Sequence, residues 1–365
     1  MPWMRRVEVI VSRKDDPSVQ TIFKSHRIDF EVRSTVGWPA DTANITLFNL
    51  SLEEVKFLQD KSYGDMYIEI RAGYNEDERG ASTGGYKNYK QPTNSTSNRI
   101  EVNTTLPTLF SGVITNAVGY RKPPEHITQL FCISKAYGAS TDFTQMTAIP
   151  AGSTVGDAIR SMCKDYGFNT ISTFGVADDV MQQVLPRGRV FHNTFLIEFR
   201  ELLGEYNLLY TVTTGEVQIF PDTFGNKDAV NRMSKDREPI KLDANSVIGN
   251  PVAGICTYTL NTFLNPAFQP GMILDVSPLL GKELLANGVT AVTGGNIVLN
   301  TDQSVFRWAV EDKYFIMEVV HKGSTHAVEY QTSITAILGG NTMMGGKEAA
   351  WQEMYANSGM AMESF

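Results

Sequence analysis

The sequence predicts an α+β protein that is mostly β, with β-rich segments at both ends and a small helical module between them. Two-sided alternation predicts the strands: Ile28, Phe30 and Val32 alternate with charged residues, and residues 66–72 repeat the pattern. A change to helical spacing after Ser153 predicts the module. At 365 residues, the chain has the length of two or three domains.

The first third of the chain is expected to form a barrel or a strongly bent sheet. A third alternating segment, 127–133, follows the two above with a less regular pattern. Between the first two, Ser51 and Glu54 have the spacing of a capping box and precede apolar residues at helical spacing. Several amphipathic strands with one short helix are typical of a barrel or bent sheet.

Residues 75–99 contain no Val, Ile, Leu, Met or Phe. A segment of this composition cannot contribute to a hydrophobic core, so we expect a long loop between two strands. Long polar loops often carry contacts, and a tolerated insertion is at least as good an interpretation.

The middle of the chain predicts two helices and a hairpin. Ser153 is the expected N-cap of the first helix, which ends at Gly167, and the second begins near Asn193 or Thr194. Strands are expected at 208–212 and 216–220, around a Thr-Thr-Gly turn.

The polar residues 222–240 are expected to form a connection, after which the pattern returns to β. Pro270 and Gly271 predict a turn before a strand at 272–277. Alternation at 314–320 and 327–337, around a turn containing Gly323, predicts a second hairpin.

Residues 339–365 differ from the rest in being rich in Gly and Met. Flexible thioethers and aromatic rings suit docking on a partner, and a disordered end is an equal alternative. The docking hypothesis rests on five residues: Met343, Met344, Trp351, Met354 and Tyr355.

The residues that could carry catalysis or bind metal do not form a recognisable set. His321 and His326 lie close in sequence but on either side of a predicted turn. We therefore interpret them as polar residues of a hairpin rather than as metal ligands. The other histidines, each beside polar neighbours, are expected at the surface: His26, His126 and His192. The sequence therefore indicates no metal and no cofactor.

Paired carboxylates and the cysteines also favour structural roles. The acidic groups at 15–16, 76–78 and 178–179 have polar surroundings, which predicts solvated turns rather than a general acid. The cysteines lie in apolar patterns and are interpreted as core residues: Cys132, Cys163 and Cys256.

Charge and hydropathy argue against further classes of protein. Lys and Arg number 32 against 40 Asp and Glu, so the formal charge is −8, which argues against a protein whose main function is to bind nucleic-acid phosphates. We identify neither a membrane-spanning run nor a signal peptide, and expect a soluble protein of a reducing compartment.

The order of the segments resembles the baseplate hub proteins of contractile-tailed bacteriophages, a family with tail-tube-like double barrels. The first barrel of that family is similar to residues 43–51, 71–74, 109–114 and 130–133 taken in order. The second barrel is similar to Asn265 and Pro266, residues 270–272, and the hairpin from 319 to 332, and residues 151–155 fit the inserted region. The resemblance covers most of residues 5–338.

This resemblance implies two tail-tube-like antiparallel β-barrel domains with an inserted α+β domain. The first barrel would span residues 1–140, the middle module 141–240, with strands near 207–220 that can rejoin a barrel, the second barrel 241–338, and the flexible or docking tail 339–365. It implies a trimeric virion protein, assembled in the host cytoplasm, that caps the tail tube and adapts its six-fold symmetry to a three-fold spike. Its implied partners are the tube protein, the central spike, other baseplate proteins and, in transit without specific binding, DNA.

Two other classes of function remain as alternatives. A tail-associated cell-wall hydrolase is one, although hub-like elements already account for the long folded segments. A carbohydrate-binding tail-tip module is the other, suggested by tryptophans that are scattered rather than clustered: Trp3, Trp38, Trp308 and Trp351.

Overall fold

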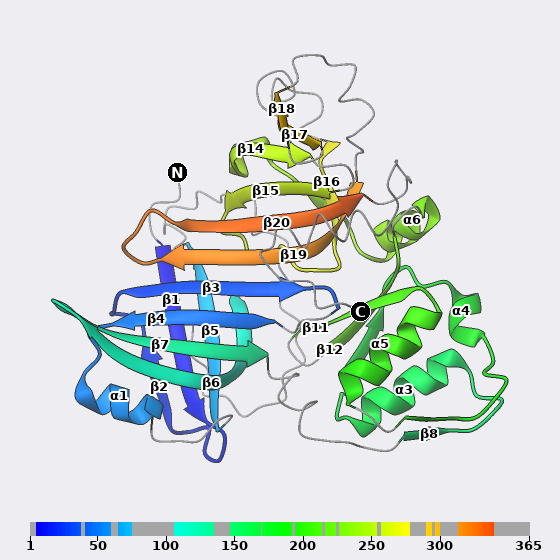
Figure 1. Ribbon diagram of the computed structural model, residues 1–365, viewed down its shortest axis with the longest axis horizontal. Coiled ribbons are helices and arrows are strands. Elements are labelled where there is room, and N and C mark those ends of the chain that lie inside the picture. The colour runs from blue at the N-terminus through cyan, green and yellow to red at the C-terminus, as the bar shows by residue number, and fades with distance from the viewer. Residues whose placement is uncertain are drawn as a thin grey trace.

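In the computed structural model, the described residues are 5–37, 41–59, 65–74, 106–134, 147–168, 170–191, 194–213, 216–223, 226–253, 257–277, 290–293, 296–299 and 313–338. One large sheet of fifteen strands runs through both ends of the chain, and a smaller α+β module lies beside it (Figure 1). The order of the main path is β18-β17-β14-β15-β20-β19-β3-β4-β7-β6-β5-β1-β2, with β13 and β16 attached at one side. The predicted fold class, α+β and mostly β, is confirmed.

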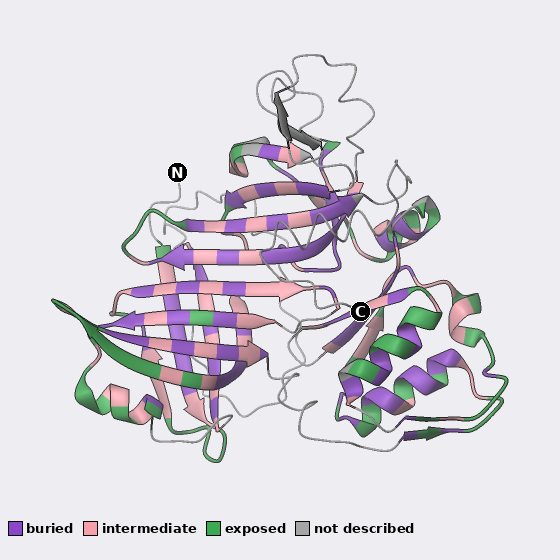
Figure 2. Cartoon of the chain, in the orientation of Figure 1, coloured by how far each residue is buried: buried purple, intermediate pink, exposed green. Residues whose placement is uncertain are grey.

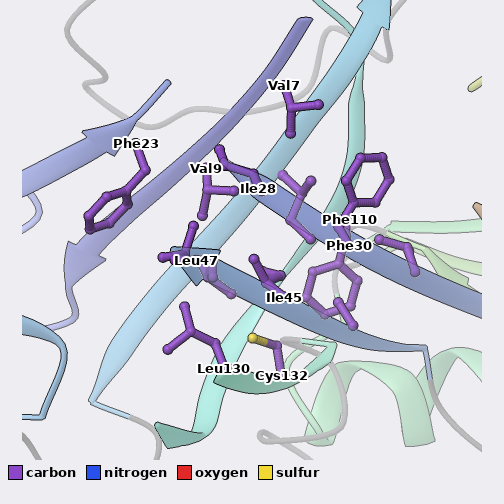
Figure 3. Packing of buried hydrophobic residues seen from close by; sticks show 14 of the residues in the cluster. Val7, Val9, Phe23, Ile28, Phe30, Ile45, Leu47, Phe110, Leu130 and Cys132 are labelled. Atoms are coloured by element: carbon purple, nitrogen blue, oxygen red, sulfur yellow. The ribbon is translucent and has the colours of Figure 1, made fainter. Parts of the chain in front are cut away.

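The first part of the chain folds into a strongly bent sheet around one core. Its elements are β1 (Arg5–Arg13), β2 (Gln20–Phe23), β3 (Ile28–Thr35), β4 (Thr42–Phe48), α1 (Leu52–Gln59), β5 (Met66–Tyr74), β6 (Thr108–Lys122) and β7 (Glu125–Ser134). Alternate residues of β1 and β3 enter the same cluster, so the two ends of this half-sheet face each other across it (Figure 3). The capping box is confirmed, because the Ser51 amide donates to the Glu54 carboxylate at 2.8 Å and the Glu54 amide donates to the Ser51 hydroxyl at 3.3 Å.

The middle module has its own core, formed by helices against a three-stranded sheet. Its elements are β8 (Thr147–Ile149), α3 (Val155–Asp165), β9 (Thr170–Thr173), α4 (Asp178–Gln182), β10 (Arg189–Phe191), α5 (Phe195–Glu205), β11 (Leu208–Thr213), β12 (Glu216–Pro221) and α6 (Lys227–Asp236). The predicted hairpin is β11 and β12, and it pairs with β9 in a sheet separate from the large one.

Three sequence expectations in this module were wrong. The N-cap of α3 is Thr154 rather than Ser153, because Thr154 and Asp157 form a reciprocal capping box. Asp178 and Asp179 begin α4 instead of lying in a turn. The expected connection contains α6, whose few apolar residues are spaced so that they all reach the core, a pattern that its polar composition conceals.

The last part of the chain completes the large sheet. Its elements are β13 (Ile240–Lys241), η1 (Ala244–Ser246), β14 (Val247–Ala253), β15 (Thr257–Phe263), β16 (Ile273–Asp275), β17 (Thr290–Thr293), β18 (Asn296–Leu299), β19 (Lys313–Ser324) and β20 (Tyr330–Leu338). The strand expected at 272–277 ends earlier, because the Asp275 carboxylate accepts the Ser277 amide at 3.0 Å and turns the chain.

Gly323 lies within β19, opposite Tyr330, and not in the predicted turn. A Cβ atom at this position would lie 2.5 Å from the Phe30 ring and 2.9 Å from the Tyr330 ring. Close packing between the two halves therefore requires the glycine, and the turn comes after it.

A single strand, β19, joins the two halves of the sheet. Along one side it pairs with β20, and along the other it pairs first with β16 and then with β3 (Figure 1). The change of partner occurs at Ile316 and Met317: Ile316 exchanges backbone hydrogen bonds with Gly271 and Met272, and the Met317 carbonyl accepts the Val36 amide at 2.8 Å. From Glu318 to Ser324 every residue is paired with β3.

The middle module packs against this same junction. Phe220 and Met233 from the module share a buried cluster with Phe315 and Met317 of β19. Gly271 has a φ of +83°, and a Cβ there would lie 2.1 Å from the Phe220 ring, so only glycine fits. The module is thus fixed to both halves at the point where β19 changes partner.

Buried residues concentrate in the strands of the large sheet and on the faces of the module's helices that pack on its small sheet (Figure 2). Among the described residues, no helix is long and apolar enough to cross a membrane. The domain boundaries given above stay a prediction.

His321 is buried, so its interpretation as a polar surface residue of a hairpin was wrong. Its Nδ1 lies 2.9 Å from the Thr332 hydroxyl, and the Phe268 backbone also hydrogen-bonds to it. Burial lowers the pKa of His321 from 6.5 to about 4, because the charged imidazolium loses its hydration. The ring is therefore neutral in the folded protein at neutral pH.

The side chain of Tyr330 joins the β19–β20 hairpin to the first half of the sheet by hydrogen bonds. Its hydroxyl accepts the Gly73 amide at 3.0 Å and lies 2.8 Å from the Gly73 carbonyl and 3.0 Å from that of Arg6. The ring belongs to the core of the first half, and the Arg5 guanidinium lies over it at 5.2 Å.

We predict that Tyr330→Phe lowers the free energy of unfolding by about 1–3 kcal/mol, because it leaves buried backbone groups of β1 and β5 without their partner. Urea denaturation of the full chain measures the change. Tyr120→Phe, at a 47% exposed ring, is the matched control and should stay close to the wild type. Equal stability of the two variants would contradict the prediction.

We predict that His321→Asn makes folding less sensitive to acid. Between pH 6.5 and about 4 the unfolded chain binds a proton at His321 that the folded chain does not, so the wild type loses stability as the pH falls. Removing this group should flatten the dependence of unfolding free energy on pH by up to about 1.4 kcal/mol per pH unit. Denaturation series across this range measure it, with His326→Asn as the control, and parallel curves for wild type and His321→Asn would contradict it.

Candidate assembly interface

The five residues predicted to dock on a partner, namely Met343, Met344, Trp351, Met354 and Tyr355, lie outside the described residues. The polar segment 75–99 and the four tryptophans do so as well, as do Cys256 and His192. The described surface must therefore supply the candidate interface.

The described residues contain no group of three or more His, Cys, Asp or Glu side chains that could hold a metal ion. Cys132 and Cys163 are buried and unpaired, as expected of core residues. Burial raises the pKa of both thiols, that of Cys163 to about 12, so neither is a reactive thiolate at neutral pH. His126 is exposed and His26 is half-buried beside Phe23.

Asp41 is the described carboxyl whose titration departs furthest from the ordinary value. Burial raises its pKa to about 7, against the opposing effect of hydrogen bonds from the Thr35 backbone and the Ser34 side chain. Its carbonyl accepts the Ser134 amide at 2.8 Å, which ties the start of β4 to the end of β7. These contacts give Asp41 a structural role at the junction of β3, β4 and β7.

The outer face of the sheet, opposite the core, carries ion pairs that cross from strand to strand. Arg33 on β3 pairs with Glu318 on β19, and Glu31 pairs with Lys322 at 3.1 Å. Both pairs bridge the two halves, beside the backbone ladder between β3 and β19. The two pairs place opposite charges side by side across the boundary between the halves.

Within the first half of the sheet, β6 and β7 form a projecting hairpin. Beyond Asn116, β6 and β7 pair with each other as far as Lys122 and Glu125, around the two-residue Pro123–Pro124 turn. The end of this hairpin stands away from the body of the protein and is exposed (Figures 1 and 2). It carries two exposed apolar side chains, Val118 at 40% and Tyr120 at 47%.

Alternation predicted a strand at 127–133, and the family resemblance included residues 109–114, but the projecting hairpin between them was not predicted. The available signal was weak, because Val118 and Tyr120 alternate with Gly119 and Arg121 over a short stretch and two prolines follow. The prolines occupy the turn itself, so they do not interrupt the ladder.

No family model matches this chain, and no curated protein matches it in sequence. The fold is similar to that of the tail protein from Neisseria meningitidis MC58, with a TM-score of 0.52, 9% identity, and coverage of 93% of this chain and 98% of that one.

Two further solved structures have lower similarity. The prophage tail protein gp18 from Listeria monocytogenes gives a TM-score of 0.48 at 8% identity, covering 96% of this chain and 98% of that one. The E. coli c3393 protein, described as a component of the type VI secretion system, gives 0.48 at 10% identity, covering 92% and 79%. The resemblance expected from the sequence is thus confirmed as a likeness of fold: over nearly its whole length, this chain has the fold of a tail protein.

Proposed function

We propose that this chain is a structural protein of a phage-like tail, a homotrimeric baseplate hub that caps the tail tube. The likeness of fold to a tail protein over nearly the full length of both chains is the observation that carries the proposal. Since one fold can serve several functions, the likeness supports the role by analogy, and the arrangement of the sheet adds a physical argument.

The physical argument concerns the two halves of the sheet. Each chain supplies two β-rich halves held side by side by the pairing of β3 with β19. In the proposed trimer, three chains present six such halves, which would meet a six-fold tube on one side and a three-fold spike on the other. The ring would leave a channel for genome passage, and the chain's negative charge of −8 would keep DNA from binding within it.

The proposed partners are the tail tube protein, the central spike and other baseplate proteins, in a virion assembled in the host cytoplasm. The role is proposed to be without catalysis. The alternatives, a cell-wall hydrolase and a carbohydrate-binding module, find no specific support in the described residues.

The mass of the purified full chain in solution tests the proposal. We expect a species of three times the 40.5 kDa chain mass, and a larger complex when the spike and tube proteins encoded beside it are added. A chain that stays monomeric with and without these proteins would contradict the hub. Lysis of peptidoglycan by the purified chain in a zymogram would favour the hydrolase instead.

The tail is proposed to dock on a neighbouring subunit or on the spike. Deleting residues 341–365 should leave the unfolding transition of the barrels unchanged but lower the yield of assembled tails, because Met343, Trp351 and the other docking residues are lost. Circular dichroism and counts of complete tails by electron microscopy measure the two effects. Tails assembled at normal yield would show that the segment is dispensable.

A further inference from the structure

The end of β3 extends past the strand that pairs with it on one side. The ladder between β3 and β4 stops at the pair Arg33 and Thr42. On the other side of β3, the Val36 amide still donates to the Met317 carbonyl of β19 at 2.8 Å. Because the N–H groups of successive residues point to opposite sides of a strand, the Thr35 N–H points away from β19, to the side where β4 has ended.

The side chain of Asp41 supplies the acceptor that β4 does not. Its carboxyl accepts the Thr35 amide and forms a second hydrogen bond with the Ser34 side chain. The backbone carbonyl of Asp41 accepts the Ser134 amide of β7 at 2.8 Å, which holds the residue in place from the opposite direction. Since a backbone N–H inside a protein needs a partner, Asp41 completes the hydrogen bonding at the end of β3.

The same end of β3 is hydrogen-bonded to the middle module, at β11 (Figure 1). The Thr211 hydroxyl donates to the Thr35 carbonyl at 3.3 Å, and the Gly37 amide donates to the Tyr210 carbonyl at 2.6 Å. Thr35 thus gives its amide to Asp41 and its carbonyl to the module. A change at Asp41 is therefore transmitted to the module through a single residue.

The carboxyl of Asp41 has no cation beside it in the part of the chain that the structure describes. Arg33 on β3 is paired with Glu318 on β19. On the module, Arg200 acts on Tyr210, whose phenol pKa is raised by burial. None of these groups contributes to the titration of Asp41, which depends on lost hydration and on two neutral hydrogen-bond donors.

Lost hydration is the stronger of these two effects. Asp41 as a whole residue is half-buried, but its carboxyl is enclosed deeply enough that the pKa rises from 3.8 to about 7 in spite of both hydrogen bonds. The folded protein therefore binds a proton between these values that the opened chain does not, and the contribution of Asp41 to stability falls as the pH rises through this range. His321 has the opposite effect below pH 6.5, so a local measurement is needed to isolate Asp41.

The protonated carboxyl satisfies both of its neighbours. One oxygen accepts the Thr35 amide while the other, as a hydroxyl, can donate to Ser34. The ionised carboxylate regains its hydration only by moving toward solvent, which leaves the Thr35 amide without its acceptor.

We propose that Asp41 is a proton-dependent latch between the large sheet and the middle module. With the proton bound, Asp41 holds the end of β3 against β11, and on ionisation this contact loosens. The inference goes beyond the proposed function and does not depend on it.

Amide hydrogen exchange of the full chain at pH 5.5 and pH 8 tests the latch. After correction for the intrinsic exchange rate at each pH, the protection factors of the Thr35 and Gly37 amides should be at least about tenfold lower at pH 8. The amides of β5, residues 66–74, are the internal reference and should keep their protection. Equal protection of Thr35 and Gly37 at the two pH values would overturn the proposal.

The variant D41N separates Asp41 from the other groups that titrate in this range. Its side-chain amide has the shape of the protonated carboxyl and can form the same two hydrogen bonds, so Thr35 and Gly37 should be as well protected at pH 8 as at pH 5.5. D16N, at an exposed aspartate between β1 and β2, is the matched control and should keep the wild-type difference. A D41N protein that keeps this difference, or that loses protection at both pH values, would overturn the proposal.

Discussion

The structure depends on one strand, β19, that pairs with three neighbouring strands. β19 pairs with β20 along one side and divides its other side between β16 and β3. Because backbone hydrogen bonds in a buried ladder cannot be left unmade without cost, this division fixes both halves of the sheet at once. The module packs its aromatic residues on the same point, with the Phe220 and Phe315 rings 5.8 Å apart. A shift of β19 would therefore disturb all three parts of the molecule together.

Contacts with the first half reinforce this strand at its far end. The hydroxyl of Tyr330 binds backbone groups of β1 and β5, and Ser324 donates to the Asp29 carboxylate at 2.5 Å. Arg5 reaches the carbonyls of Ala327 and Val328 in the turn. The halves are thus joined by a backbone ladder, a buried hydroxyl and ion pairs across the ladder, and they form one continuous sheet. In the hub that we propose, a continuous sheet of this kind would hold the spike side and the tube side in a fixed relation.

The sequence alone determined which residues of β3 and β5 face the core, where α1 and α5 begin, and that the middle of the chain changes to helical spacing. The alternation in β3 and β5 and the Ser51–Glu54 capping box are local patterns, and each appears in the structure where the sequence placed it. Only the tertiary structure decided that β3 pairs with β19, that His321 is buried, and that β6 extends beyond its neighbour β5. The physical reason is that a period of two specifies the face of a strand but not the partner at its edge, which can lie almost 300 residues away, as Ser324 does from Asp29.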